Sequence, residues 1–174
     1  MGYKTSWLVG EDDQVASIHW LTKEIKDFDV EGLNEVTPKG FSYCQTTDNR
    51  LFISGGRGHF RHLHELIRSG VDQMVIIQKA NSAHNHGTHA IIPVGNKFLV
   101  AASGMRGKDF SSSCELYEIS TDKWQALPSL NISRREHTGC VFGEKICYLF
   151  GGWNAEYTSI NEIEWLDLQA GKQW

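Results

Sequence analysis

This chain contains no apolar run that approaches the roughly 20 residues a membrane-spanning helix needs. It also lacks the G-x-S-x-G, P-loop and H-E-x-x-H motifs. These absences remove the usual sequence support for a serine hydrolase, a nucleotide-phosphate site or a zinc protease. The N-terminal residues 1–6 lack the apolar stretch of a secretory signal.

A large excess of charge is missing as well. The 17 Lys and Arg residues against 21 Asp and Glu residues give a net charge of −4. A protein with this balance has no basic surplus for nucleic acid or an anionic membrane, so we expect neither as a partner. The four cysteines lie in strand-like runs, at Cys44, Cys114, Cys140 and Cys147. We therefore expect buried, reduced thiols and a cytoplasmic protein.

What the chain does have is a repeat. Three similar segments, Leu51–Gly56, Leu99–Gly104 and Cys147–Gly152, follow one another at equal intervals along the sequence. Each is a short apolar run that closes with a Gly-Gly or Ser-Gly pair. A repeat of about 50 residues built from short apolar strands is typical of a propeller blade.

The repeat divides the chain into four units, which we number in chain order: 1–39, 40–87, 88–136 and 137–174. A full unit has four strands, named a to d. Unit 1 lacks strand a, unit 2 is degenerate, and unit 4 is cut in strand d. The repeat register makes residues 62–68 a strand, although their apolar spacing also fits a helix.

The predicted fold is therefore all-β, a partial propeller of about three and three-quarter four-stranded blades. Closed propellers have about four to eight blades, and an open arc leaves an apolar sheet face exposed at each end. We expect further blades or a second copy of the chain to complete the propeller. The sequence fits a fragment of a longer propeller better than an obligate assembly.

Residues at fixed places in the units resemble the Kelch repeat family. The residues that carry the resemblance end strand b, lie in strand c and open strand d: Ser103-Gly104, Tyr117 and Trp124 in unit 3, and Gly151-Gly152, Trp165 and Trp174 in unit 4. Met74 replaces the Trp in unit 2, and Ile25 replaces it in unit 1. The resemblance implies a Kelch-type β-propeller, in which we expect the glycines to let a neighbouring aromatic approach the backbone closely.

The longer loops carry the candidate site. In a four-stranded meander the b–c and d–a loops leave one face, and the tight a–b and c–d turns leave the other. The predicted partner-binding residues are Arg57, Arg61, Arg106, Lys108, Arg134, Arg135, Trp153 and Tyr157. Basic and aromatic side chains together suit an acidic or phosphorylated segment of another protein. The competing interpretation is ordinary solvated loop charge, some of it paired with Asp109 or Glu136.

Five histidines of unit 2 could converge: His59, His62, His64, His84 and His86. Zinc takes three or four ligands in near-tetrahedral geometry, yet no Cys or carboxylate stands at ligand spacing beside them. We predict polar loop histidines, with no metal and no cofactor. The sequence leaves open whether this group binds a metal.

Three functions follow from these patterns. The leading hypothesis is a non-enzymatic protein–protein interaction module, because the chain has the repeat and shows no motif of an activated nucleophile. The second is a structural assembly unit of a larger complex. The third is a metal-dependent propeller enzyme, since the propellers that this chain resembles include copper oxidases. Its candidate ligands would be Tyr157, His84 and His86.

Overall fold

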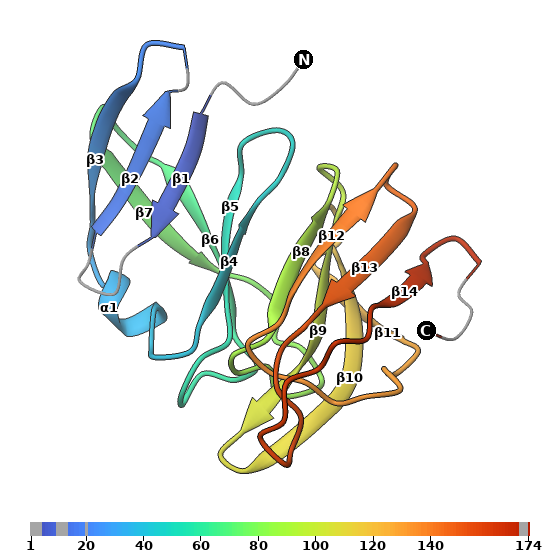
Figure 1. The fold of residues 1–174 in the computed structure, drawn as a ribbon. Coiled ribbons are helices and arrows are strands. Elements are labelled where there is room, and N and C mark those ends of the chain that lie inside the picture. Colours follow the sequence, from blue (N-terminus) through green and yellow to red (C-terminus); the bar gives the residue numbers. More distant parts are fainter. Residues whose placement is uncertain (1–4, 10–13, 20, 171–173) are drawn as a thin grey trace.

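The computed structural model describes residues 5–9, 14–19, 21–170 and Trp174. These residues form four successive groups of strands and one short helix (Figure 1). Unit 1 holds β1 (Thr5–Val9), β2 (Gln14–His19) and β3 (Glu24–Val30), followed by α1 (Leu33–Val36). Unit 2 holds β4 (Ser42–Gln45), β5 (Leu51–Ser54), β6 (Leu63–Arg68) and β7 (Gln73–Gln78).

The other two units repeat the arrangement. Unit 3 holds β8 (Ala90–Val94), β9 (Phe98–Arg106), β10 (Asp109–Glu118) and β11 (Lys123–Leu127). Unit 4 holds β12 (Thr138–Phe142), β13 (Ile146–Phe150) and β14 (Glu164–Asp167). Residues 62–68, whose apolar spacing also fits a helix, contain the strand β6, as the repeat register predicts. No helix in the described part of the chain is long and apolar enough to cross a membrane.

Consecutive strands within each unit pair antiparallel, as a meander requires. Units 3 and 4 form separate sheets, but units 1 and 2 share a seven-stranded sheet. In that sheet β3 and β7 pair in parallel through only two residue pairs, Asp29 with Gln73 and Val30 with Met74. At the other edge, the Gln45 side chain donates to the carbonyl of Thr5 at 2.9 Å. Units 1 and 2 are thus joined at both edges.

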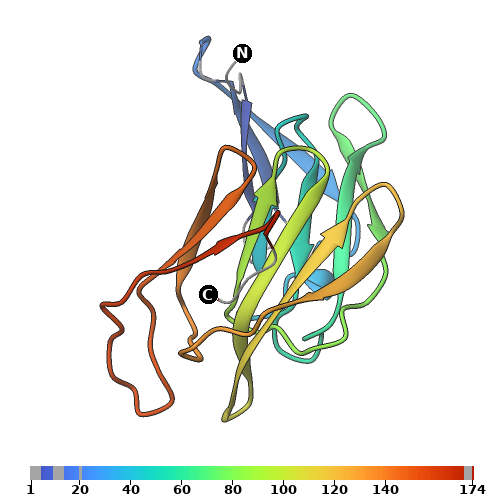
Figure 2. The same cartoon turned by 90° about the vertical axis from the view of Figure 1, so that its right-hand side faces the viewer.

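Apolar layers lie between successive units, which stack as neighbouring sheets in Figure 2. Phe28 of unit 1 packs in one layer with Ile53 and Leu66 of unit 2. The opposite face of unit 2 presents Phe52 to a layer that includes Tyr117 of unit 3. Burying one such side chain contributes about 1.5–3 kcal/mol relative to leaving it exposed, so these layers hold the array together.

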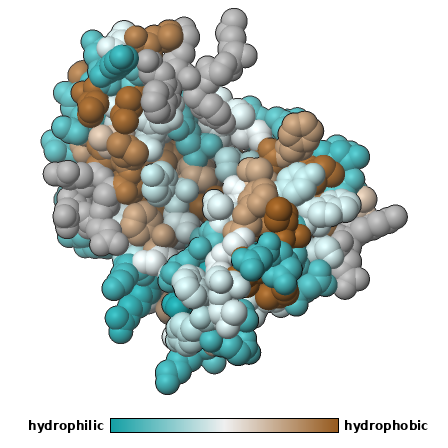
Figure 3. All heavy atoms as spheres, viewed as in Figure 1, coloured by the Kyte–Doolittle hydropathy of each residue, from teal (hydrophilic) through white to brown (hydrophobic). Residues whose placement is uncertain are grey.

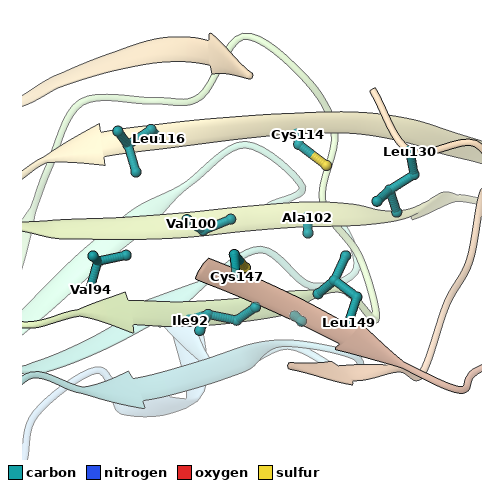
Figure 4. Packing of buried hydrophobic residues seen from close by; sticks show 10 residues of the cluster. Ile92, Val94, Val100, Ala102, Cys114, Leu116, Leu130, Cys147 and Leu149 are labelled. Carbon is teal, nitrogen blue, oxygen red and sulfur yellow. The ribbon is translucent and has the colours of Figure 1, made fainter. Parts of the chain in front are cut away.

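The third layer, between units 3 and 4, is drawn in Figure 4. Val100 and Ala102 of β9 face Cys147 and Leu149 of β13 across it. All four of these side chains are fully buried. These three successive apolar layers confirm the predicted all-β array of radially stacked units.

The repeat extends to individual hydrogen bonds between loops. One backbone bond recurs three times: Arg57 N–H to Lys39 at 3.0 Å, Met105 N–H to Gly87 at 2.8 Å, and Trp153 N–H to Arg135 at 3.0 Å. A second bond links successive units, from Thr88 N–H to Gly40 and from Glu136 N–H to Thr88, both at 2.7 Å. The first bond therefore links all four units at equivalent positions, and the second does so at the junctions that lead into units 2, 3 and 4.

The two small residues that end strand b have different requirements. At the first position φ is 68° for Gly55, 58° for Ser103 and 64° for Gly151, which is the ordinary left-handed region that a side chain can enter at a cost. At the second position φ rises to 98°, 109° and 91°, in Gly56, Gly104 and Gly152. The first position can therefore hold serine, as Ser103 does in unit 3, and the space around Gly151 would also admit a Cβ, whereas a Cβ at Gly55 would overlap the carbonyl oxygen of His86.

The second glycine also admits a close contact. A Cβ at Gly104 would lie 2.8 Å from the carbonyl oxygen of Gly87, and one at Gly152 would lie 2.5 Å from that of Arg135. We expected an aromatic ring to make this approach. The group that does so is mainly the backbone of the preceding d–a loop, with the Cβ of His89 or His137 beside it.

The outer face of unit 4 has no described sheet packed against it. Phe142 is 74% exposed and Trp165 is 54% exposed. Hydrophobic residues show on the surface over β12 and β13 in Figure 3. Cys140 lies in the same sheet and is exposed, so the prediction of a buried thiol is wrong for this residue. The other cysteines are buried and unpaired, and burial raises the pKa of Cys114 and Cys147 to about 12.

Trp165 is also not the structural counterpart of Tyr117, although the repeat pattern pairs the two. Glu115 pairs with Ala101, whereas Glu164 pairs with Leu149, the residue that corresponds to Ala101 in unit 4. The alignment of strand c is therefore shifted by one residue in unit 4. A shift by one turns every side chain of a strand to the other face, so Trp165 points outward.

The two glycine positions give a matched pair of variants. We expect Gly152→Ala to lower the free energy of unfolding by at least about 2 kcal/mol, because the new Cβ meets the Arg135 carbonyl in a strained backbone conformation. Gly151→Ser should cost about 1 kcal/mol or less, because a Cβ there has no neighbour closer than 4.0 Å. Urea unfolding of both variants checks this. Equal losses would contradict it.

Candidate binding face

The described b–c and d–a loops gather at one end of the sheets, the lower end in Figure 1, while the tight turns lie at the other. The loops are tied together by backbone bonds such as Gly104 N–H to Arg134 at 3.0 Å. Trp153 of the last b–c loop bridges both Arg135 and Ser159. Figure 3 shows mostly hydrophilic residues at this lower end. We call this surface the loop face.

Two buried carboxylates hold the d–a loops that follow β7 and β11 in place. Glu115 on β10 accepts from the backbone N–H of Ala83 at 2.9 Å, from that of His84 at 3.0 Å, and bonds Nε2 of His86 at 3.0 Å. Its side chain comes from unit 3, and the loop it holds belongs to the end of unit 2. The carboxylate therefore connects two units as well as fixing a loop.

Glu164 on β14 repeats the arrangement one unit later. It accepts from the N–H of Asn131 at 2.7 Å, from that of Ile132 at 3.3 Å and from Nη2 of Arg134 at 2.6 Å. These three loop positions correspond in the repeat to Ala83, His84 and His86. Arg134 is thus the structural counterpart of His86.

This arrangement corrects one predicted site residue. Arg134 is fully buried, and its guanidinium also donates to the carbonyls of Gly151 at 3.1 Å and Glu162 at 3.3 Å. A buried cation of this kind persists because a carboxylate and hydrogen bonds compensate its lost hydration. Arg134 cannot contact a partner and serves to position the loops.

Arg135, the next residue, lies at the loop face. Its guanidinium carbon sits 4.9 Å from the centre of the Tyr157 ring and 5.9 Å from that of Phe110. Nη1 also lies 3.4 Å from a carboxylate oxygen of Glu136, the pairing that the solvated-charge interpretation named. Trp153 is 42% exposed and Tyr157 is 60% exposed. These residues form a cation–aromatic surface between units 3 and 4.

Four other predicted residues, Arg57, Arg61, Arg106 and Lys108, are exposed. In the described part of the chain none of them forms an ion pair. The alternative pairing of these charges with Asp109 is therefore absent among the described residues. Two hollows lie among them. One of about 310 Å³ is lined by Phe60, Met105, Arg57 and Lys39. The other, of about 430 Å³, is lined by Arg61, Arg106, Phe60 and polar residues without a carboxylate.

The histidines fall into two groups rather than one. His59 and His62 have ring centres 4.7 Å apart, and His64 follows at 5.8 Å from His62. Burial and the nearby charges of His59 and Arg61 lower the pKa of His62. The remaining pair, His84 and His86, both contact Glu115. Among the described residues, no group of three or more His, Cys, Asp or Glu has the arrangement of a metal site.

Sequence reasoning missed Lys39, which lines the smaller hollow. It falls at the end of the incomplete unit 1, where no site residue was predicted. The repeat contained the signal, because Lys39 occupies the position in its unit that Gly87 and Arg135 occupy in theirs, and Arg135 was predicted. Phe60 and Met105, which line the same hollow, were not predicted as site residues either.

The comparisons with known proteins point to the same kind of fold. Kelch repeat and BTB domain-containing protein 2 of cowpox virus (strain GRI-90 / Grishak) is 23% identical over 126 residues, which are 70% of this chain and 22% of that protein. The horsepox virus protein of the same name is 29% identical over the same lengths. Kelch-like protein 15 of Homo sapiens is 26% identical over 117 residues, 64% of this chain and 19% of that protein.

These matches span about a fifth of each relative's length. No protein-family model matches the chain. Among solved structures, that of YjhT superposes with a TM-score of 0.62 at 12% identity, covering 87% of this chain and 48% of the other, a likeness of fold alone. The Kelch resemblance predicted from the sequence is confirmed, and the chain is a partial β-propeller of Kelch type.

The carboxylate of Glu115 gives a pH-dependent prediction. Burial alone would raise its pKa, but the hydrogen bonds from His86 and from the Ala83 and His84 backbone lower it to about 2. A carboxyl whose pKa is lowered on folding stabilises the protein above its unfolded-state pKa, and that contribution is lost as the pH falls towards 2. We expect Glu115→Gln to cost about 1–3 kcal/mol at pH 7 and to flatten the loss of stability between about pH 5 and 2.

Urea unfolding at pH 7, 5 and 3 measures both effects. Glu144→Gln, at an exposed residue of the β12–β13 turn, is the control and should behave like the unmodified chain. A Glu115→Gln variant with unchanged stability at pH 7 would contradict the role of this carboxylate.

Proposed function

We propose that this chain is a non-enzymatic protein–protein interaction module that binds a segment of another protein through the loop face. The observation that carries the proposal is the set of exposed basic side chains without carboxylate partners in an acidic protein. Arg57 lines the smaller hollow, Arg61 and Arg106 line the larger one, and Lys108 is exposed between β9 and β10. Arginine and aromatic side chains are enriched where proteins bind one another tightly.

The loop face has a second property that suits binding. Its d–a loops after β7 and β11 are fixed by buried carboxylates, and backbone bonds tie the b–c loops to the d–a loops, so the backbone that carries the exposed side chains is ordered before a partner arrives. Binding then loses less conformational entropy than it would with mobile loops. The names of the relatives, Kelch repeat and BTB domain-containing protein 2 and Kelch-like protein 15, are consistent with a repeat module used within larger proteins.

A second candidate function is assembly through the outer face of unit 4. Exposed Phe142 and Trp165 favour it, because large apolar side chains that gather on one sheet face commonly mark an interface. The occupant would be a further blade or a second copy of the chain. Self-association in sedimentation velocity that is lost in the Phe142→Ser variant would support this function. A chain that sediments as a monomer would contradict self-assembly through this face.

Site-specific cross-linking tests the loop-face proposal. A photo-reactive residue at position 108 should cross-link a defined partner protein in cells. The double variant Arg57→Glu/Arg106→Glu should lower the yield about tenfold or more, because it places negative charge where an acidic segment would bind.

The matched control is Lys97→Glu/Lys123→Glu, which changes the same charge at the turn end of the sheets. Lys97 and Lys123 lie in or beside the tight turns, away from the loop face. The control should cross-link like the unmodified chain. A yield that falls equally in both variants, or in neither, would show that the loop face is not the binding surface.

A further inference from the structure

The larger of the two hollows on the loop face has an unusual lining. It lies between the loop after β5, the loop after β7 and the β9–β10 hairpin, and holds about 430 Å³. Its polar side chains all carry hydrogen-bond donors: Arg61, His62, Asn81, Asn85 and Arg106. No carboxylate lines it among the described residues.

The donors in this hollow are largely unused. Arg61 donates its Nε–H to the carbonyl of Ser82, which fixes the side chain and leaves its two Nη groups available. Arg106 makes no side-chain hydrogen bond or ion pair with any described residue. Two guanidinium groups thus face one hollow in a chain whose net charge is −4. Such a site attracts an anion.

The number of donors distinguishes between anions. A carboxylate offers two oxygen atoms and one negative charge, so it would leave several of these donors without a partner. A phosphorylated side chain offers three terminal oxygens and a charge of about −1.5 to −2 at pH 7. Two arginine forks and neighbouring amides are the groups that bind such a phosphate best.

A second hollow adjoins the first, and Phe60 lines both. This neighbour holds about 310 Å³, and Phe60 and Met105 give it apolar walls. Gly87 contributes to it without a side chain, since a Cβ there would meet the carbonyl oxygen of Met105 at 2.6 Å. One peptide segment could therefore place an anionic and an apolar side chain in adjacent hollows.

We infer that the loop face binds a phosphorylated segment, with the phosphoryl group between Arg61 and Arg106 and a nearby apolar side chain against Phe60 and Met105. This inference rests on the proposed function and specifies the ligand of that same face. The two hollows then bind different parts of the segment. The donor-lined hollow binds the phosphate, and the apolar hollow binds a side chain close to the phosphorylated residue.

Peptide libraries test the inference. Three libraries share degenerate flanking positions and carry phosphoserine, serine or glutamate at the fixed centre. The immobilised full chain should retain the phosphoserine library at least about tenfold better than either of the others. Sequencing the retained peptides should show enrichment of Leu, Met or Phe within a few residues of the phosphoserine.

Three variants connect this result to the hollows. Arg106→Gln should abolish the preference for phosphoserine, and it removes no side-chain hydrogen bond within the described structure. Met105→Ala should weaken the apolar enrichment and keep the phosphate preference. Lys97→Gln, at the turn end, should leave both unchanged.

Equal retention of the three libraries, or a phosphoserine preference that survives in Arg106→Gln, would overturn the inference. The cross-linking experiment separates this failure from that of the proposed function. If position 108 still cross-links a partner while phosphoserine is not preferred, only the ligand assignment is wrong. If position 108 does not cross-link a partner and phosphoserine is not preferred, the loop face is not the binding surface.

Discussion

The carboxylates of Glu115 and Glu164 connect the layers of this molecule to its candidate site. Each belongs to strand c of one unit and binds two backbone N–H groups in the d–a loop of the unit before it. Loops at a sheet end would otherwise expose these donors to water and move independently. Because the acceptor comes from the next sheet, stacking of the sheets and ordering of the loops happen together.

The units differ in the third hydrogen-bond partner of each carboxylate. Glu115 has His86, and Glu164 has Arg134, at equivalent positions of the repeat. Unit 2 departs further, since the residue that pairs with Ile53, at the position of Glu115 and Glu164, is His64. The adjacent Glu65 faces the other side of the sheet and pairs with Arg50 at 2.6 Å. Pro38 stands at the position of His86 and Arg134, and a proline side chain has no donor to offer. The loop around α1 is accordingly held in another way, by Thr37 bonding back to Leu33.

Much of the fold could be predicted, because a constant period is visible in the apolar runs and their glycines. Periodicity places strands, and stacking them requires no knowledge of side-chain contacts. The shift by one residue in strand c of unit 4 could not be predicted, since both Trp165 and Leu166 are apolar enough to be buried there. Only the pairing of Glu164 with Leu149 shows which one faces the core.

The candidate site was less predictable for a related reason. Composition identified the loops and their arginines, but adjacent residues such as Arg134 and Arg135 look alike in a sequence. One is fully buried on Glu164, and the other stacks on Tyr157 at the surface. Lys39 was overlooked because the repeat is weakest in unit 1, where the backbone position is kept and the surrounding sequence is not. Sequence patterns locate a loop, and the contacts of the neighbouring unit decide which of its side chains is exposed.

The most direct measurement of the central claim is amide hydrogen exchange of the unmodified chain at single-residue resolution. If strand-c carboxylates fasten the d–a loops, the N–H groups of Ala83, His84, Asn131 and Ile132 should be protected nearly as well as those of β9, although they lie in loops. Exchange of these four amides at the rate of freely exposed loop residues would contradict the account.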